Sequence, residues 1–176
     1  PRGYFRWLSE ATGGAWVAVE KILAPDEQLP TDWPVAGTTG YDASWRIDQL
    51  QVDQAGAARL GALMQELSGD SPASYPAVVE AAKREIISGS LSAEVERLAR
   101  ILATLTATDV DLRDHTLRDL RCCVVELLVA AERYRAYAVP GEVVSPETAA
   151  VLRADAEIAR TRLQPDQGET LDLVVA

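Results

Sequence analysis

WVAVEKIL, residues 16–23, is the stretch that decides the expected fold of the first part of the chain. Its four apolar residues, 16–19, predict a short strand that is buried on both faces, as in a parallel sheet. A predicted helix, residues 2–11, precedes this strand, and a loop rich in proline and glycine, residues 24–41, follows it. The order of helix, strand and long loop is typical of α/β barrels and doubly wound sheets.

The rest of the chain predicts stacked helices. Seven of its ten aromatic residues, including all four tryptophans, lie within residues 1–45. The remainder is rich in Ala, Leu, Val, Arg and Glu, with apolar residues at the three- and four-residue spacing of an amphipathic helix. We expect these apolar stripes to face the core. They lie in residues 57–67, 76–86, 91–107 and 116–131.

Two helix starts and one further strand are predicted later in the chain. Thr116 and Ser145 are predicted N-caps, because their hydroxyls can accept hydrogen bonds from the free N–H groups of a first turn. Pro146 occupies the favoured first helical position, and Pro165 is expected to close that helix. Residues 134–139 are compatible with a second strand.

The charge balance excludes two classes of partner. The chain has 17 Lys and Arg against 27 Asp and Glu, so its net charge is −10. Nucleic acid and anionic membrane surfaces attract clustered positive charge. The longest nearly apolar run, residues 122–131, contains Glu126 and is too short to span a bilayer. We therefore expect no nucleic acid and no membrane partner, and a cytoplasmic location.

No metal site and no cofactor is expected. Cys122 and Cys123 are adjacent, and neighbouring residues do not easily reach the geometry of a relaxed disulfide. Both are expected to be small apolar residues of a helix. His115 is the single histidine and is expected in a surface loop. No spacing of Cys and His resembles a zinc site.

Two acidic residues near the predicted strand are candidates for chemistry. Glu20 directly follows the strand, and α/β folds place active-site groups at the C-terminal ends of strands. Asp42 ends a loop, residues 37–42, whose hydroxyls, carboxylate and aromatic ring suit a sugar. The alternatives are structural. Glu20 would pair with Lys21 or an arginine, and Asp42 would be the N-cap of the next helix.

Several segments together carry a family resemblance. The most specific lie in the first 42 residues, at 16–23, 29–30, 33–35 and 37–42, and the Tyr-Arg-Ala-Tyr segment at 134–137 and the helix from Ser145 agree with them. They closely resemble the maltooligosyl trehalose synthase family, which are glucosylmutases of the α-amylase family. The resemblance runs over essentially the whole chain, although the helical middle is only compatible with it.

The resemblance implies that the chain is an internal fragment of a larger enzyme with a (β/α)₈ barrel. Its fold class is then mainly α, a helical insertion, with one or two short strands that belong to the barrel. Residues 1–45 would supply a helix, a strand and an active-site loop of the barrel. Residues 46–131 would form an inserted helical subdomain, and residues 132–176 would return to the barrel.

The resemblance also implies a reaction. The family isomerises the reducing-end α-1,4 bond of a maltooligosaccharide to α,α-1,1, which gives a maltooligosyl trehalose. Glu20 carries over as the general acid/base at the end of the fifth barrel strand, in a retaining mechanism that uses a second carboxylate as nucleophile. Six residues carry over as substrate-binding candidates: Lys21, Thr39, Tyr41, Asp42, Arg135 and Tyr137.

Two parts of the expected site fall outside residues 1–176. In the family, the nucleophilic aspartate precedes the position of Pro1, and a third acid follows that of Ala176. The chain alone is therefore expected to be inactive, with a maltooligosaccharide and the remainder of the parent polypeptide as its partners. Residues 43–53 and 132–133 depart from the family pattern, which bears on how the inserted helices pack.

Two other functions stay open. Another α-amylase-family hydrolase or transglycosylase would share the acid, but ordinary amylases lack the 37–42 loop directly after it. A non-catalytic helical interaction domain would suit the composition of the helical part. It would leave the aromatic-rich first 45 residues unexplained.

Overall fold

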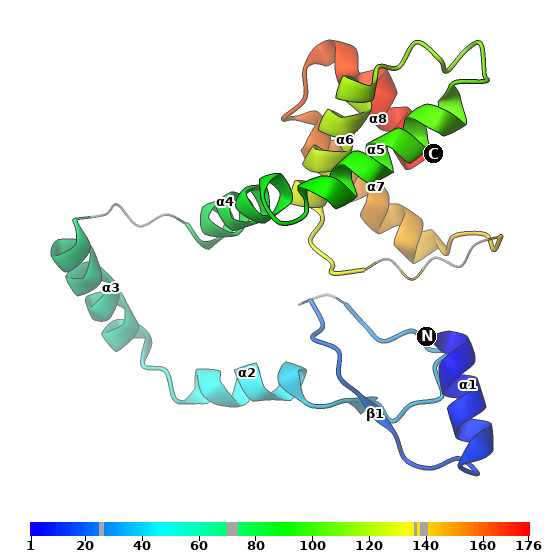
Figure 1. Ribbon diagram of the computed structural model, residues 1–176. Coiled ribbons are helices and arrows are strands. Elements are labelled where there is room, and N and C mark those ends of the chain that lie inside the picture. The colour runs from blue at the N-terminus through cyan, green and yellow to red at the C-terminus, as the bar shows by residue number, and fades with distance from the viewer. Residues whose placement is uncertain (25–26, 70–73, 136, 138–140) are drawn as a thin grey trace. The chain divides into compact units, whose positions relative to one another are not determined.

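The computed structural model describes residues 1–24, 27–69, 74–135, 137 and 141–176. The chain divides into two compact units, residues 1–72 and 73–176 (Figure 1). Both strands of the described residues belong to the first unit, and the second unit is helical. The predicted class, mainly helical with one or two short strands, is therefore confirmed.

The first unit contains two short parallel strands and three helices. In chain order the elements are α1(Arg2–Ala11), β1(Ala18–Val19), β2(Gly37–Thr38), α2(Tyr41–Leu50) and α3(Gln54–Ser68). The register pairs Ala18 with Gly37 and Val19 with Thr38. α1 contacts the loop between the strands through Phe5 and Trp33, whose ring centroids lie 4.9 Å apart. The helix predicted at residues 2–11 is confirmed.

Two details of the predicted strand region were wrong. The strand covers only Ala18–Val19 rather than residues 16–19, and Trp16 is 81% exposed, so the stretch is not buried on both faces. The region predicted as loop, 24–41, contains β2. The stretch is exposed because β1 has one neighbouring strand, β2, and within the described residues no further strand flanks the pair. β2 was missed because it consists of only Gly37 and Thr38, and glycine is depleted in strands.

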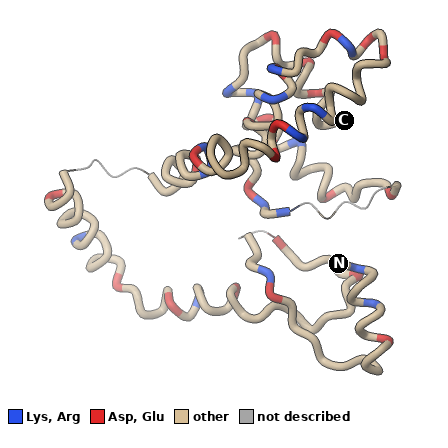
Figure 2. Tube along the Cα trace, viewed as in Figure 1, with Lys and Arg blue, Asp and Glu red and all other residues tan. Residues whose placement is uncertain are grey.

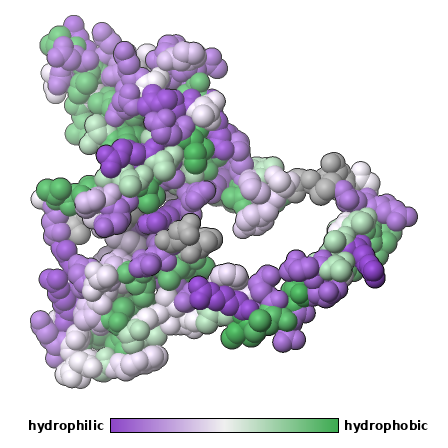
Figure 3. Space-filling model, turned by 180° about the vertical axis from the view of Figure 1, so that it is seen from behind, coloured by the Kyte–Doolittle hydropathy of each residue, from purple (hydrophilic) through white to green (hydrophobic). Residues whose placement is uncertain are grey.

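The apolar stripe of α3 does not face a core within this unit. Its large side chains are exposed by 48–76%, at Leu60, Leu63, Met64 and Leu67. Figure 3 shows hydrophobic side chains on the surface of the segment from α2 to α3. The helix itself was predicted correctly, but the burial of its stripe was not. Spacing identifies the face that another element could cover, whereas burial requires that such an element is present.

The second unit is a set of helices around one central helix. Its elements are α4(Tyr75–Ser88), α5(Ser92–Thr106), α6(Leu117–Ala130), α7(Pro146–Arg160), the 3₁₀ helix η1(Pro165–Gln167) and α8(Gly168–Val175). α6 packs against α4, α5, α7 and α8 (Figure 1). Leu120 and Cys123 of α6 are fully buried, as are Val95 of α5 and Leu171 of α8. The core of this unit therefore lies around α6.

The predicted helix starts of the second unit are confirmed. The hydroxyl of Thr116 accepts a hydrogen bond from the backbone N–H of Asp119 at 3.1 Å. The hydroxyl of Ser145 accepts one from the backbone N–H of Thr148 at 3.2 Å. Each hydroxyl satisfies an N–H group that has no partner inside its helix. Pro165 was expected to close a helix, but α7 ends at Arg160 and Pro165 begins η1.

Half of the strand suggested for residues 134–139 falls outside the described residues. Residues 136, 138 and 139 are among those not described. Of the others, Tyr134, Arg135 and Tyr137 have no strand assignment.

An ion-pair network links α4 to the central helix. The Arg84 guanidinium donates two hydrogen bonds to Glu126, Nη1 to Oε1 and Nη2 to Oε2, each at 2.8 Å. Glu80 accepts from Arg84 at 3.0 Å and from Arg162 at 2.7 Å. This network explains why Glu126 interrupts the apolar run 122–131. Acidic and basic residues are interspersed on both units rather than gathered in one patch of a single sign (Figure 2).

Candidate functional site

Glu20 lies on a tight turn at the C-terminal end of β1. The carbonyl oxygen of Val19 accepts hydrogen bonds from the backbone N–H of Lys21 at 3.1 Å and of Thr39 at 3.0 Å. The first of these bonds spans three residues and has Glu20 at its centre, which is the geometry of a γ-turn. The second ties the turn to the end of β2. Glu20 is exposed, so its carboxylate is free to meet a ligand from solvent.

Tyr41 contacts this carboxylate. Its phenol hydroxyl donates to Oε1 of Glu20 at 3.3 Å. Tyr41 is the first residue of α2, and Gly40 before it has φ 102°, in the left-handed region that favours glycine. The sequence therefore directs the chain from β2 into α2 so that Tyr41 lies beside Glu20.

Lys21 does not pair with Glu20, contrary to the structural alternative for that residue. Its ammonium donates to Oε1 of Glu27 at 2.7 Å. The side chains of Lys21 and Glu27 are 8% and 5% exposed, so the pair is buried. Glu27 was not singled out from the sequence. It lies six residues from Lys21 within an irregular loop, where spacing does not indicate which side chains meet.

Asp42 lies in the first turn of α2 but is not its N-cap, which is Gly40. Its carboxylate accepts a hydrogen bond from the Thr38 hydroxyl. This bond, and a second from backbone N–H, lower the pKa of Asp42 because both stabilise the ionised form. Thr38 was not predicted, although its position four residues before Asp42 is a weak signal. Thr39 next to it is exposed.

An open hollow of about 580 Å³ lies beside this cluster. Trp45 contributes an aromatic ring to its lining, and the polar side chains come from Glu27, Gln28, Thr38, Asp42 and Arg46. Glu20 is not among its lining residues. The first unit thus brings together five of the seven predicted site residues around the ends of β1 and β2, at Glu20, Lys21, Thr39, Tyr41 and Asp42.

The other two predicted site residues belong to the second unit. The Arg135 guanidinium carbon lies 5.8 Å from the centroid of the Tyr137 ring, so the two side chains contact each other. His115, expected at the surface of a loop, is in a loop but half-buried. Its Nδ1 lies 2.8 Å from the hydroxyl of Thr170 on α8.

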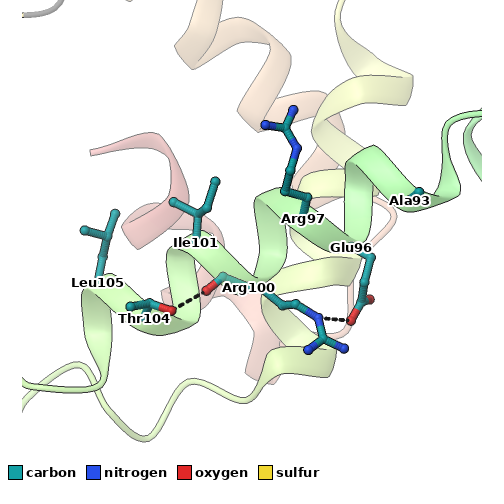
Figure 4. Close-up of a pocket in the computed structure, with 7 residues that line it drawn as sticks. All are labelled: Ala93, Glu96, Arg97, Arg100, Ile101, Thr104 and Leu105. Carbon is teal, nitrogen blue, oxygen red and sulfur yellow. Dashed lines mark hydrogen bonds and ion pairs between the residues drawn. The ribbon is translucent and has the colours of Figure 1, made fainter.

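A shallow hollow of about 470 Å³ on the second unit is lined by one helix alone. All seven of its lining residues belong to α5 (Figure 4). They include Arg100, which donates to Glu96 at 2.9 Å across one helical turn. The remaining lining is largely aliphatic, with Ile101 and Leu105 on the same side of the helix (Figure 4). We assign no function to this surface.

Neither a metal cluster nor a membrane-spanning helix occurs among the described residues. In those parts of the chain, no group of three or more His, Cys, Asp or Glu side chains could hold a metal ion. Among the same residues, no helix is long and apolar enough to cross a bilayer.

Comparison with known proteins gives one consistent result. No family model matches the chain. A curated Mycobacterium tuberculosis protein named as a maltooligosyl trehalose synthase is 38% identical over 136 residues, which are 77% of this chain. A maltooligosyltrehalose synthase structure from Arthrobacter ramosus matches 99% of the chain with 32% identity and a TM-score of 0.76. A glycosyltrehalose synthase structure, 23% identical with a TM-score of 0.67, shows the same fold.

The matched regions are small parts of these proteins. They cover 17% of the curated relative and 20% of the Arthrobacter ramosus chain. The similarity nevertheless includes both units, because the structural match extends over 99% of this chain. In sequence and in fold, the chain is thus related to one segment of the maltooligosyl trehalose synthases.

Proposed function

We propose that the chain is a segment of a maltooligosyl trehalose synthase and contributes its general acid/base, Glu20. The parent enzyme isomerises the reducing-end α-1,4 bond of a maltooligosaccharide to an α,α-1,1 bond. The observation that carries the proposal is the placement of Glu20. It is an exposed carboxylate on a turn at the C-terminal end of a parallel strand, in contact with the Tyr41 hydroxyl.

Glu20 has two tasks in this reaction. Its carboxylic acid protonates the departing glycosidic oxygen while a carboxylate from outside this segment attacks the anomeric carbon. The resulting carboxylate of Glu20 then takes the proton of the anomeric hydroxyl of the released glucose, which attacks the glycosyl-enzyme. The product is the α,α-1,1 bond. Exclusion of water during the second step separates isomerisation from hydrolysis.

The neighbours of Glu20 suit a sugar substrate. Tyr41 donates to Glu20, and Asp42 is held ionised by Thr38, so it can accept hydrogen bonds from sugar hydroxyls. Thr39, which directly follows Thr38, is exposed. We propose these residues of the first unit as contacts to the maltooligosaccharide. Arg135 and Tyr137 of the second unit are proposed separately as substrate-binding residues of the parent enzyme. The two short strands would belong to the (β/α)₈ barrel of the parent, as in the α-amylase family, and the protein would act in the cytoplasm.

This proposal assigns each segment of the chain to a part of the parent enzyme. Residues 1–45 would belong to the barrel, 46–131 to an inserted helical subdomain and 132–176 to a second barrel portion. The nucleophile and the third acid would come from the remainder of the polypeptide. The isolated 176-residue chain is therefore expected to lack glucosylmutase activity.

The reaction is tested with the complete parent enzyme and maltopentaose. Isomerisation removes reducing ends and leaves the number of sugar units per chain unchanged, whereas hydrolysis creates reducing ends and shorter products. We expect reducing ends to disappear while an α,α-1,1 anomeric signal appears in the NMR spectrum. A rise in reducing ends would favour an ordinary α-amylase-family hydrolase. No change at all would favour a non-catalytic helical domain.

A further inference from the structure

The side chain of Lys21 is directed into the protein, although the residue directly follows an exposed catalytic candidate. Its ammonium lies 2.7 Å from Oε1 of Glu27, and the two side chains are 8% and 5% exposed. Burial of two charges costs solvation free energy, which only close pairing and further hydrogen bonds offset. Lys21 and Glu27 therefore form a fixed contact rather than a surface ion pair that exchanges with water.

Glu27 is itself held in place by the backbone. Its second carboxylate oxygen, Oε2, accepts a hydrogen bond from the backbone N–H of Ala24 at 3.1 Å. Its own backbone N–H donates to the carbonyl oxygen of Ala24 at 3.0 Å. Both the side chain and the backbone of Glu27 are thus hydrogen-bonded to Ala24. The Lys21 ammonium therefore binds a carboxylate whose position in the loop is fixed.

The backbone of Lys21 closes the turn that carries Glu20. Its N–H donates to the carbonyl oxygen of Val19, and the same oxygen accepts from the N–H of Thr39. Lys21 is thus fixed by its main chain to the end of β1 and by its side chain to Glu27. Glu20 is the middle residue of the turn from Val19 to Lys21, and its own side chain contacts only the exposed hydroxyl of Tyr41 among the contacts described.

We propose that Lys21 and Glu27 are a positioning pair for Glu20, and that Lys21 does not bind the substrate directly. The pair holds the turn in one conformation, so that the Glu20 carboxyl meets the glycosidic oxygen in a productive position. This inference rests on the proposed function of Glu20. Misplacement of a catalytic group by about 1 Å can lower a rate by about 10²-fold, so a remote pair can affect turnover strongly.

The main test is the double variant Lys21→Met with Glu27→Gln in the complete enzyme. It removes both charges of the pair together, so neither Lys21 nor Glu27 is left charged opposite a neutral side chain. We expect kcat to fall by about 10- to 100-fold, while KM stays within about twofold of the parent value. Lys21→Arg, which keeps a cation opposite Glu27, is expected to retain most of the turnover.

Two results of this test would overturn the proposal. A kcat within about twofold of the parent value would mean that the pair does not position Glu20. An increase in KM with unchanged kcat would mean that Lys21 binds substrate. The matched control is Arg2→Met with Asp32→Asn, which removes an exposed ion pair of 3.3 Å from the same unit and should leave both constants unchanged.

A second variant covers the case in which the double variant does not fold. Glu27→Asp keeps both charges but shortens the side chain that carries the carboxylate by one methylene. It is expected to lower kcat several-fold at constant KM, and an unchanged kcat would again overturn the proposal. Glu20→Gln is measured in parallel. If it retains full turnover, the proposed function fails, whatever the pair variants do.

Discussion

The Tyr41 hydroxyl donates a hydrogen bond to Oε1 of Glu20 at 3.3 Å, which joins the first residue of α2 to the turn after β1. The two residues are 21 positions apart in the sequence. They meet because β1 and β2 run parallel, so that the ends of both strands lie at the same edge. The contact gives the acid/base candidate its only side-chain partner among the described hydrogen bonds.

Tyr41→Phe removes this hydroxyl and keeps the ring. We expect kcat of the complete enzyme to fall about fivefold, equivalent to about 1 kcal/mol, because Glu20 loses one hydrogen bond. Steady-state kinetics on a maltooligosaccharide measures the effect. Tyr4→Phe on α1, an exposed tyrosine without a described contact to Glu20, is the matched control. Equal effects of the two substitutions would show that the contact has no catalytic role.

Glu126→Gln tests the ion-pair network of the second unit. Glu126 accepts hydrogen bonds from both terminal nitrogens of Arg84. These bonds raise the pKa of the guanidinium, and the bond to Glu80 raises it further. Since the Arg84 side chain is 39% exposed, we expect a loss of only about 1 kcal/mol in the free energy of unfolding. Urea unfolding of the 176-residue chain measures it. Glu96→Gln removes an exposed pair with Arg100 within α5 and a longer one with Arg121 of α6 at 3.9 Å. It should cost about 0.3 kcal/mol, and a larger cost there than at Glu126 would contradict the prediction.

Asp119 makes the stability of the second unit depend on pH. The Thr116 hydroxyl, and after it the Gln167 amide, lower the pKa of Asp119 by hydrogen bonding to its ionised form. Because the pKa of Asp119 is lower in the folded protein than in the unfolded chain, its ionised form stabilises the fold at pH values above the unfolded-state pKa of 3.8. That stability is lost as the pH falls through the folded-state pKa.

Asp119→Asn should therefore lower the midpoint of thermal unfolding at pH 7, and the difference from the parent chain should shrink as the pH falls below 3.8. Differential scanning calorimetry from pH 7 to strongly acidic pH measures this. Asp114→Asn, an exposed residue of the preceding loop, is the control. A difference for Asp119→Asn that is independent of pH would exclude its ionisation as the cause.

The adjacent cysteines should differ in reactivity. Cys123 is fully buried, and burial, together with the neighbouring Cys122 and Asp119, raises the pKa of its thiol to about 11. Cys122 is half-buried. Because the thiolate is the reactive form, a thiol reagent at neutral pH should label Cys122 first and Cys123 only after unfolding. In Cys122→Ser, rapid labelling of the folded chain would contradict this assignment.

Local signals predicted the secondary structure well. Thr116 and Ser145 were recognised as N-caps because a hydroxyl at that position satisfies a backbone N–H of the same helix. Such interactions depend on residues three positions apart, so they can be derived without knowledge of the fold. α1 has no such cap, and its bounds were predicted from the spacing of its apolar residues and from the Gly13-Gly14 turn that follows it.

Contacts between distant residues could not be derived in this way. The structural alternative for Glu20 paired it with Lys21, its neighbour in sequence, or with an arginine, but the loop brings Glu27 to Lys21 instead. The stripe of α3 was predicted to be buried, but spacing gives only the direction of an apolar face. Glu20 itself was identified from its place after an apolar stretch. Its contact with Tyr41 became evident only from the pairing of β1 with β2.

The most direct test of the account is the turnover of Glu20→Gln in the complete enzyme, with Glu10→Gln on α1 as the matched control. Glutamine keeps the size of the side chain but cannot donate and recover the proton. We predict that kcat for formation of the α,α-1,1 product falls by about 10²- to 10⁴-fold in Glu20→Gln. The control should remain within twofold of the parent, as expected for an exposed surface position (about ±0.5 kcal/mol). A Glu20→Gln enzyme that folds normally and keeps its turnover would contradict the account.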